Sequence, residues 1–335
     1  MGQAMIGGPG VSVLMITYNH AAYVAKAIEG VLAQQLAEPF ELIIGEDCST
    51  DDTRAIVEGL RQRYPETIRL ITGPHNVGMN ENFRRTALAA RGEYVAFCEG
   101  DDFWHNPLKL ARQLAVARAN PNIGMVYSDY DRAVRLLGRW RILRNVIGRS
   151  GERPAEGDAF EDLLDRIQVH LSTMLCRRTL VTTYLQSALY DATLKLSDVP
   201  LLLYCAAHAQ VGYLAESTSI YRSIPSSAVN QSSSRRLQIV QDHVAVVRRF
   251  EVQFGSDPER RRARRRRLDT MIASSAYAAC NREVYRAVAT KELKPRLRSL
   301  MMRAPMLHYA YMHWVAERQK MHFWRASENG QALLN

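Results

Sequence analysis

The amino-acid sequence predicts an α/β fold: a mostly parallel sheet flanked by helices, then a mixed region, then a helical C-terminal extension. Two observations predict it. In about the first 130 residues, short apolar runs alternate with helical patterns, which is the rhythm of a parallel sheet covered on both faces. After residue 234 the pattern is helical throughout, with no internal repeat. A chain of 335 residues is long enough for one large or two modest units.

The expected elements of the first region follow one another through short connections. Signals such as Pro65, Gly92 and Pro121 close the helical patterns. Acidic and amide side chains collect after the strands, at the edge where open α/β sheets bind ligands. The expected strands are 11–17, 40–46, 68–72, 94–98 and 125–128, and the expected helices are 21–35, 53–64, 82–90 and 108–119.

The rest of the chain has a different organisation. A basic segment ends near Arg149 and a connector rich in Gly, Pro and Glu follows it; the stretch from Val199 to Ala215 predicts a buried helix and then a strand. A Ser-rich loop is expected at 223–234. We therefore expect three regions, 1–130, 131–234 and 235–335, the last with helices at 237–250, 260–289 and 293–324.

Composition is that of an ordinary globular protein except for a formal net charge of +10. Five cysteines lie far apart with no CxxC pair, which excludes a structural zinc site of the usual spacing and favours reduced thiols in a cytoplasm. The N-terminus lacks the pattern of a secretory signal, and we expect no transmembrane segment.

Two motifs follow the first two expected strands. Thr17-Tyr18-Asn19 ends the first, and Glu46-Asp47-Cys48-Ser49-Thr50-Asp51-Asp52-Thr53 ends the second. An acidic side chain at a strand end can accept hydrogen bonds from a base or a ribose. The alternative is structural, since Ser, Thr and Asp residues also cap a following helix.

The densest acidic motif is Glu99-Gly100-Asp101-Asp102, directly after the apolar run 94–98. Three carboxylates within four residues repel one another, and a hard divalent cation, Mn²⁺ or Mg²⁺, would compensate them and also neutralise a diphosphate. A solvated acidic turn is the alternative. A third motif, His75-Asn76-Val77-Gly78, predicts either a nucleotide contact or a turn with Gly78 at positive φ.

Taken together, these motifs resemble the inverting family-2 glycosyltransferases of GT-A fold. The order and spacing cover about the first 220 residues, and the combination is more specific than any single piece. The motifs are V-S-V-L-M-I-T-Y-N (11–19), E-D-C-S-T-D-D-T (46–53), N-V-G (76–78), R-G-E-Y-V-A-F-C-E-G-D-D (91–102) and Y-R (221–222).

The resemblance implies a nucleoside-diphosphate-sugar donor and a Mn²⁺ or Mg²⁺ ion. Glu99-Gly100-Asp101 stands where the family has its D-x-D signature, with Asp101 as the direct metal ligand. The family usually has Asp in place of Glu99 and often Gly in place of Cys48. The implied donor-binding residues are Thr17, Tyr18, Asn19, Asp47, Asn76, Gly78, Glu99, Gly100 and Arg222.

Inverting transfer needs a carboxylate that takes the proton from the acceptor hydroxyl. The resemblance places this base at Asp198, although Ser197 or Asp198 before an apolar run also has the pattern of a helix N-cap. Arg222 would contact the leaving diphosphate, because a guanidinium pairs with phosphate through two hydrogen bonds. Relatives often have a His at the position of Ile224. Candidate acceptor contacts are Asp102, Trp104 and His170, the last also open to a structural role.

The basic excess peaks at residues 260–267, where seven of eight residues are Arg. This run is compatible with a solvated helix face, a nucleic-acid patch or attraction to anionic lipid. No nucleic-acid-binding module is recognisable, and we expect no nucleic-acid partner. The segment from Ala304 to Ala316 is apolar and rich in aromatic residues; it is too short to span a membrane but can lie in its interface, or pack on the catalytic domain, or form a homo-oligomer contact.

The sequence thus predicts a metal-dependent inverting glycosyltransferase that acts on a saccharide or lipid-linked acceptor, in bacterial surface-polysaccharide synthesis, at the cytoplasmic membrane face. The alternatives are a glycan-binding scaffold of the same fold that has lost catalysis, and a nucleotidyltransferase. The latter should have a Gly-rich basic loop after the first strand, where this chain has Thr17-Tyr18-Asn19-His20. A dinucleotide oxidoreductase is excluded, because no G-x-G-x-x-G follows a strand.

Overall fold

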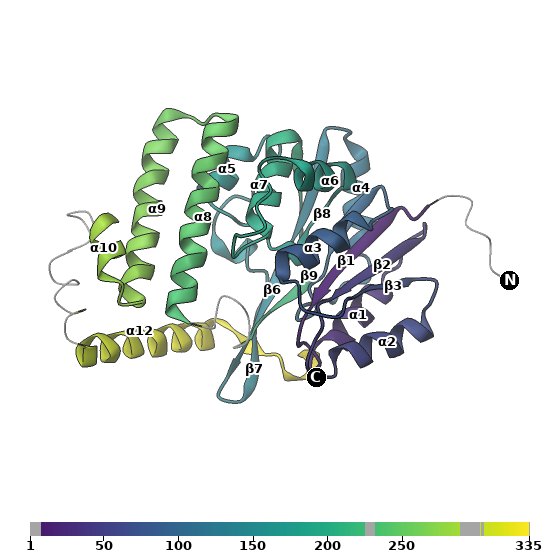
Figure 1. The fold of residues 1–335 in the computed structure, drawn as a ribbon, viewed down its shortest axis with the longest axis horizontal. Coiled ribbons are helices and arrows are strands. Elements are labelled where there is room, and N and C mark those ends of the chain that lie inside the picture. The colour runs from purple at the N-terminus through teal and green to yellow at the C-terminus, as the bar shows by residue number, and fades with distance from the viewer. Residues whose placement is uncertain (1–7, 225–231, 289–301, 303–304, 335) are drawn as a thin grey trace. The chain divides into compact units, whose positions relative to one another are not determined.

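The computed structural model describes residues 8–224, 232–288, 302 and 305–334 (Figure 1). The chain has two compact units. The first comprises Met1–Arg132, Arg144–Thr193 and Ser197–Arg222, and the second comprises Ala133–Leu143, Leu194–Leu196 and Ser223–Asn335. The first unit carries all the expected site residues.

The first unit is built on a parallel sheet in the order β3 (Ile68–Ile71), β2 (Phe40–Glu46), β1 (Val11–Thr17), β4 (Tyr94–Phe97). Val11 pairs with Phe40 and Tyr94, and Thr17 pairs with Glu46, so the carboxyl ends of these strands share one edge. Each strand was expected from the sequence, and β1 and β2 have the expected bounds.

The sheet becomes mixed beyond β4, as the sequence predicts for the following region. The strand β8 (Leu175–Arg177) lies antiparallel between β4 and β6 (Ile123–Leu136). Two antiparallel steps restore the direction, so β6 runs parallel to β4 without bonding to it. A long strand, β9 (Gln210–Ser223), pairs with β6 and with the two-residue β5 (Phe103–Trp104).

Helices cover both faces of the parallel sheet. Val13 and Met15 of β1 share a buried cluster with residues of α1 (Val24–Leu32), α2 (Thr53–Arg63) and α4 (Lys109–Ala119). The opposite face of β2 meets α3, where a Cβ at Gly45 would lie 2.0 Å from Thr86 Oγ1. The remaining helices of this unit are α3 (Met79–Leu88), α5 (Phe160–Asp165), α6 (Arg178–Gln186) and α7 (Asp198–His208), with 3₁₀ turns at Gly148–Ser150 and Leu171–Thr173.

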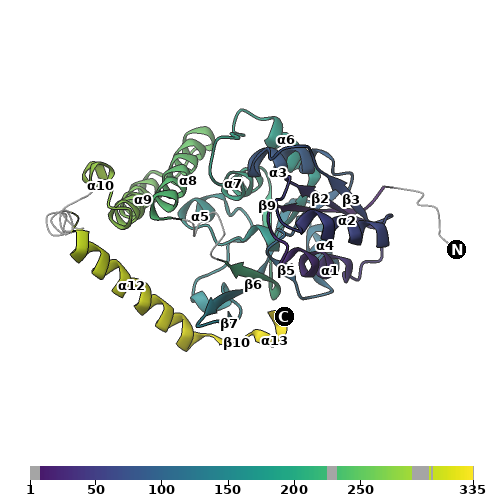
Figure 2. The ribbon, with the colours of Figure 1, turned by 60° about the horizontal axis from the view of Figure 1, so that its bottom comes forward.

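The second unit is mainly helical, as expected. Figure 2 shows α8 and α9 side by side. A small antiparallel arrangement joins β7 to the end of β6 and to β10. Most of the expected Ser-rich loop and the stretch 289–301 lie outside the described residues. The elements are β7 (Arg139–Leu143), α8 (Ser233–Phe254), α9 (Pro258–Ala278), α10 (Arg282–Val288), α12 (Pro305–Ala326), β10 (Glu328–Asn329) and α13 (Gln331–Leu334).

Among the helices of the described part of the chain, none combines the length and the apolar character needed to cross a bilayer. The stretch from Val199 to Ala215, which contains no Asp, Glu, Lys or Arg, forms most of the buried helix α7 and the start of β9. The assignment of separate donor, acceptor and C-terminal roles to 1–130, 131–234 and 235–335 stays a prediction.

Candidate active site

The loops after β1 and β2 are tied together by Asn19. This residue has a positive φ of 56°. Its backbone N–H donates to Ser49 Oγ at 3.0 Å, and its Oδ1 accepts from Thr50 N at 2.8 Å. Next to it, Tyr18 is 42% exposed, so its ring is free to meet a ligand at this edge. Asn19 therefore fixes the loop from which Tyr18 projects.

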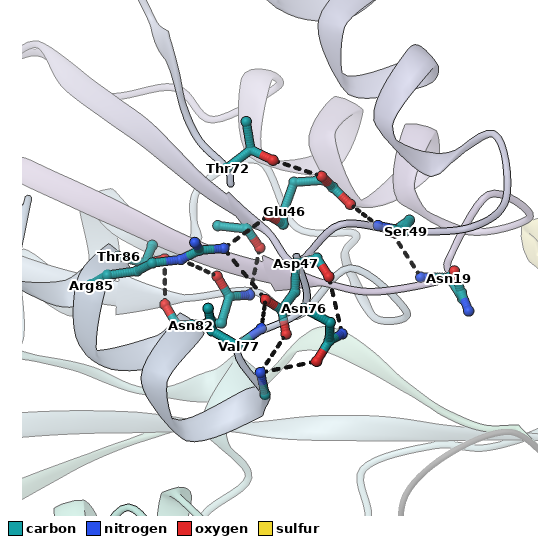
Figure 3. A network of polar contacts seen from close by, with 12 residues as sticks. Asn19, Glu46, Asp47, Ser49, Thr72, Asn76, Val77, Asn82, Arg85 and Thr86 are labelled. Atoms are coloured by element: carbon teal, nitrogen blue, oxygen red, sulfur yellow. Dashed lines mark hydrogen bonds and ion pairs between the residues drawn. The ribbon is translucent and has the colours of Figure 1, made fainter. Parts of the chain in front are cut away.

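The carboxylate of Glu46 has a structural role in the same loop. Its Oε1 accepts from Ser49 N at 2.6 Å and its Oε2 from Thr72 Oγ1 at 2.9 Å (Figure 3). Burial alone would raise its pKa, but these hydrogen bonds outweigh burial and lower it. Cys48, two residues on, has a φ of 58°, which explains why a glycine suits this position. The expected side-chain cap of α2 by Ser49 or Thr50 is absent.

Asp47 holds the loop that follows β3. Its Oδ1 accepts from Val77 N and its Oδ2 from Gly78 N, both at 2.9 Å, while Asn76 Nδ2 donates to its carbonyl oxygen at 3.0 Å (Figure 3). Gly78 has the expected positive φ, 86°. Since Asp47 is only 2% exposed, it shapes this edge of the sheet chiefly through the loop. Direct contacts of Asp47, Asn76 and Gly78 with a donor stay predictions.

Arg85 of α3 contacts the same network through its guanidinium group. Its Nη2 donates to the carbonyl oxygen of Glu46 at 2.9 Å and lies 3.5 Å from Asp47 Oδ1. Its Nε donates to Asn82 Oδ1, and Asn82 Nδ2 donates to Gly45 O at 2.7 Å (Figure 3). Helix α3 is therefore bonded to the end of β2 by side chains as well as by packing.

The acidic turn 99–102 packs directly against the end of β1. A Cβ at Gly100 would lie 2.6 Å from Thr17 Oγ1 and 2.9 Å from His20 Nδ1, so only glycine fits there without displacement. His20 Nε2 in turn lies 4.0 Å from Asp101 Oδ2. Thr17 is 2% exposed and sits beneath the turn, which makes it a support of the acidic motif.

Burial and neighbouring negative charges raise the pKa of two carboxyl groups of this turn, Glu99 and Asp102. Burial, and then the charges of Asp101 and Asp198, raise the pKa of Glu99 to about 8. Burial, and then Asp101 and Glu99, raise the pKa of Asp102 well above its usual range. Burial and mutual repulsion therefore disfavour the charged forms of Glu99 and Asp102, as expected for close carboxyl groups.

Arg222 is the cation built into this site. It is 1% exposed and lies on β9; its backbone N–H donates to Asp102 Oδ1 and its Nη1 donates to the carbonyl oxygen of Asp101, both at 2.9 Å. Its guanidinium stacks 4.4 Å from the Phe103 ring centre and 5.3 Å from that of Tyr23. We expected a contact with the leaving diphosphate. The structure gives Arg222 a buried position under the acidic turn, and the diphosphate contact stays a prediction.

His170 lies beside Asp102, on the segment before β8. Its Nδ1 is 3.8 Å from Asp102 Oδ2 and 2.8 Å from Ser172 Oγ. Its ring packs against Tyr221 and Tyr130, with ring centres 4.4 and 5.4 Å away. Burial lowers the pKa of His170 to about 4, so the imidazole is neutral near pH 7 and can act as a ligand or an acceptor.

Trp104 lies in the core and not on an open surface. It is 2% exposed, and its Nε1 donates to Ser172 O at 2.9 Å. Gln113 Nε2 donates to the next carbonyl, Thr173 O, at 2.6 Å. Trp104 therefore holds the turn that follows His170. This geometry gives it a supporting role, and its expected direct contact with an acceptor stays a prediction.

Asp198 begins α7 and faces the acidic turn closely enough for its charge to raise the pKa of Glu99. The competing explanation was a helix cap. Ser197 occupies the N-cap position but makes no side-chain capping hydrogen bond with the described residues, and Asp198 Oδ1 accepts from the adjacent Val199 N, at 2.9 Å. Because Asp198 is partly exposed, its carboxylate remains available to an acceptor.

The residues of the acidic turn fit a divalent cation. Among the described residues, ligand atoms of Glu99, Asp102 and His170 lie within 4.8 Å of one another. The Oδ2 of Asp102 is buried and has no hydrogen-bond partner among them. A buried carboxylate oxygen left unpaired beside two further acidic groups is the donor chemistry that Mn²⁺ or Mg²⁺ requires. Asp101, the expected ligand, lies outside this tight set, and its role stays a prediction.

Sequence reasoning did not assign a role to several residues of the site. His20 follows the Thr17-Tyr18-Asn19 motif directly, so its proximity to Asp101 could have been suspected. Arg85 gives less warning, because it is one of many basic residues on helices. Tyr130 contacts His170 from β6. Tyr221, which the sequence placed only within the Y-R motif, contacts it from β9, and the pairing of β6 with β9 brings the two tyrosines together.

Comparison with known proteins identifies the family. Residues 12–178 match the family model described as glycosyl transferase family 2. A protein of Mycobacterium tuberculosis, described as uncharacterised, is 32% identical over 221 residues, which are 63% of this chain and 58% of that protein. The chain thus spans little more than half the length of that relative. TuaG of Bacillus subtilis, whose name assigns it to teichuronic acid biosynthesis as a glycosyltransferase, is 36% identical over 106 residues, 32% of this chain and 41% of TuaG.

A solved structure agrees on the fold. The mannosyltransferase PcManGT from Pyrobaculum calidifontis, in complex with GDP-Man and Mn²⁺, superposes with a TM-score of 0.58 over 93% of this chain and 87% of that chain, at 16% identity. At that identity the likeness shows the fold alone, and it confirms the expected GT-A-like architecture. Through residues 12–178, this chain belongs to glycosyl transferase family 2.

Proposed function

We propose that this chain is a metal-dependent inverting glycosyltransferase that moves a sugar from a nucleoside-diphosphate sugar to a saccharide or lipid-linked acceptor. One observation carries the proposal. The acidic turn 99–102 stands at the carboxyl edge of the sheet, and the carboxylate of Asp198 lies near enough to raise the pKa of Glu99. A cation-binding group and a separate partly exposed carboxylate thus face one edge, as inverting transfer requires.

The donor is proposed to lie along the loops that Asp47 and Asn19 hold together. Tyr18 is exposed there and can stack on a base, while Asn76 and Gly78 offer polar backbone and amide groups. Thr17 and Gly100 shape the floor by their close contact. Pyrophosphate would approach the acidic turn, where its charge requires a cation.

Asp101, with Glu99, would hold a Mn²⁺ or Mg²⁺ ion, which when bound neutralises charge on the leaving diphosphate. Asp101 is the better candidate than Asp102 for the open side, because Asp102 is 1% exposed and accepts a hydrogen bond from Arg222 N. Arg222 keeps the turn in place. The unpaired Oδ2 of Asp102 and neutral His170 remain as further ligands.

Asp198 is proposed as the base. Its carboxylate accepts the proton of the acceptor hydroxyl as that oxygen attacks the anomeric carbon from the face opposite the diphosphate. The start of α7 holds it in place, since Val199, Pro200 and Leu201 behind it are buried. An acceptor from surface-polysaccharide synthesis is the proposed substrate class, supported by the similarity to TuaG.

Two linked experiments test the proposal. Calorimetric titration of UDP, GDP and dTDP, with and without Mn²⁺, should show Mn²⁺-dependent binding of one nucleotide to wild type, and Asp101→Asn should lose the Mn²⁺ dependence. Glu66→Gln, an exposed acidic residue after α2, is the matched control. In a transfer or donor-hydrolysis assay with the nucleotide sugar so identified, Asp198→Asn should keep nucleotide binding but lose about 10²- to 10⁴-fold in rate.

The outcomes separate the possible functions. Nucleotide binding without any transfer by wild type would favour a glycan-binding scaffold of the same fold. No binding of the three nucleotides with either metal would contradict the donor site itself. Full activity of Asp198→Asn would exclude Asp198 as the base and leave the donor site standing.

A further inference from the structure

The helix α12 of the second unit contacts the rest of that unit near both ends, and its residues 312–326 are exposed or half-buried. Near its start, the His308 ring packs edge-on against Tyr277 of α9, with ring centres 4.8 Å apart. At its other end, Arg141 of β7 stacks 4.3 Å from the Trp324 ring centre and donates to Trp324 O at 3.0 Å. No residue from 312 to 326 is buried, and Figure 2 shows the middle of α12 standing apart from α8 and α9.

One face of residues 312–326 combines apolar and basic side chains. Trp314, Arg318, Met321 and Arg325 follow one another at spacings of four, three and four residues, which places them on one side of a helix. Trp314 and Met321 are each 54% exposed, and the Arg318 guanidinium lies 5.4 Å from the Trp314 ring centre. An open groove of about 490 Å³ runs along this face; its described lining residues are Trp314, Glu317, Arg318, Met321, His322 and Arg325.

The net charge of this face is positive, because its one acidic side chain forms an ion pair with a lysine of the same helix. Glu317, the only acidic residue from 312 to 326, pairs with Lys320 at 2.6 Å. Arg318 and Arg325 therefore remain as the net charge of the stretch. In the same unit, Arg262, Arg265 and Arg266 are exposed on one side of α9, whereas Arg264 is buried and donates to Glu251 Oε1 at 2.5 Å.

The combination of exposed apolar and basic side chains on α12 favours one kind of binding partner over the others. A second copy of the chain, meeting α12 through the same face, would bring Arg318 and Arg325 against their own kind. Nucleic acid would match the arginines but would leave Met321 without an apolar partner. An anionic bilayer surface matches both, because indole rings and apolar side chains enter the headgroup boundary while guanidinium groups meet lipid phosphates.

We propose that the face of α12 formed by Trp314, Arg318, Met321 and Arg325 docks the protein on an anionic lipid surface, with the exposed arginines of α9 adding attraction at longer range. The helix lies in the plane of the interface and does not cross it. This surface acts independently of the transfer reaction, so the proposal does not depend on the function proposed above.

Vesicle flotation tests the proposal with the full chain. Wild type should float with vesicles of phosphatidylglycerol mixed with phosphatidylcholine, should bind pure phosphatidylcholine far less, and should be released by high salt. Arg318→Gln with Arg325→Gln should weaken binding on the order of 25-fold, because each arginine near an anionic surface contributes roughly a fivefold factor. Trp314→Ser with Met321→Ser should weaken it at least as much.

Matched controls separate this face from general charge and exposure. Arg61→Gln with Arg63→Gln removes two exposed arginines of α2, and Val252→Ser alters a side chain of α8 that is 85% exposed; neither should change flotation. Circular dichroism of each variant checks that it is folded. Wild type that ignores anionic vesicles, or binding unchanged by both α12 variants, would overturn the proposal. Self-association of wild type lost in the α12 variants, without vesicle binding, would also overturn it and assign the face to a second copy.

Discussion

Replacing Lys109 by Met should stabilise the protein at neutral pH. The side chain of Lys109 is fully buried on α4, where its Nζ donates to Gln113 Oε1 at 2.5 Å and to Thr173 O at 3.3 Å, 4.5 Å from the Trp104 ring centre. It has no carboxylate partner among these contacts. Burial therefore lowers its pKa from the ordinary value of 10.5 to about 7.

The size of the effect follows from that shift. A difference of roughly 3.5 pKa units between the unfolded and folded states means that the charged Lys109 destabilises the folded protein by at most about 5 kcal/mol at pH 6. Methionine has a similar length and no charge. It loses the bond to Gln113 Oε1, which costs about 1 to 3 kcal/mol if that oxygen stays unpaired. The net gain at pH 6 should therefore be at most about 2 to 4 kcal/mol.

The sign of the pH dependence makes the test specific. In wild type, Lys109 is charged in both folded and unfolded states below pH 7, where the penalty is complete, and neutral in both above pH 10.5, where it vanishes. The advantage of Lys109→Met should therefore shrink as the pH rises from 7 to 10. Urea unfolding at pH 6, 8 and 10 measures it, with the exposed Lys195→Met as control. A variant less stable than wild type at pH 6, or a difference independent of pH, would refute the reasoning.

Three further changes have defined outcomes. Cys48→Gly should raise the free energy of unfolding by about 0.5 to 1 kcal/mol, since relief of the φ of 58° outweighs the added freedom of the unfolded chain, whereas Cys48→Ala should not; urea unfolding compares them. Gly100→Ala should weaken Mn²⁺-dependent nucleotide binding in calorimetry, because its Cβ would displace Thr17 and His20 from beneath the acidic turn; unchanged binding would show that the turn yields. Arg222→Met should lower the unfolding free energy by about 1 to 3 kcal/mol, because the carbonyl oxygen of Asp101 loses its hydrogen bond from Nη1, and Arg222→Lys should be less affected. Equal melting temperatures for all three proteins would contradict this.

The parallel half of the fold could be predicted because its strands are long enough to carry a pattern. The runs 11–17 and 40–46 are mostly apolar and are buried along nearly their whole length, as strands covered on both faces are. The strand β8 has only three residues and β5 only two, so neither has a period to detect. The antiparallel strand between β4 and β6 depends on a return of the chain from about 50 residues further on, which no local pattern encodes.

The β6–β7 hairpin has an alternating apolar pattern in its sequence, but the arginines between the apolar residues obscure it. Ala133, Leu136, Trp140 and Ile142 are buried among exposed arginines, and the turn between them has positive φ at Leu137 and Gly138. The expected basic segment is therefore a two-stranded hairpin. A leucine in place of the usual Asn or Asp conceals the turn from sequence inspection.

The candidate site also has features that the sequence predicts and features that it does not. Motifs that lie on one strand end, such as 46–53 and 99–102, could be located and given a chemistry. The burial of Arg222 and Trp104 could not, because β9 reaches the acidic turn only through its pairing with β5, where Phe103 opposes Ile220 and Trp104 opposes Ser219. A cationic residue in a strand gives no sign of whether it faces solvent or a carboxylate cluster.

The two hydrogen bonds from Val77 and Gly78 to the carboxylate of Asp47 have a consequence for binding thermodynamics. The loop after β3 is already fixed by the strand beside it, so a nucleotide that settles there meets a preformed edge and does not have to order this loop. The amide protons of Val77 and Gly78 should therefore exchange slowly with solvent deuterium even without ligand, and added nucleotide should slow them little.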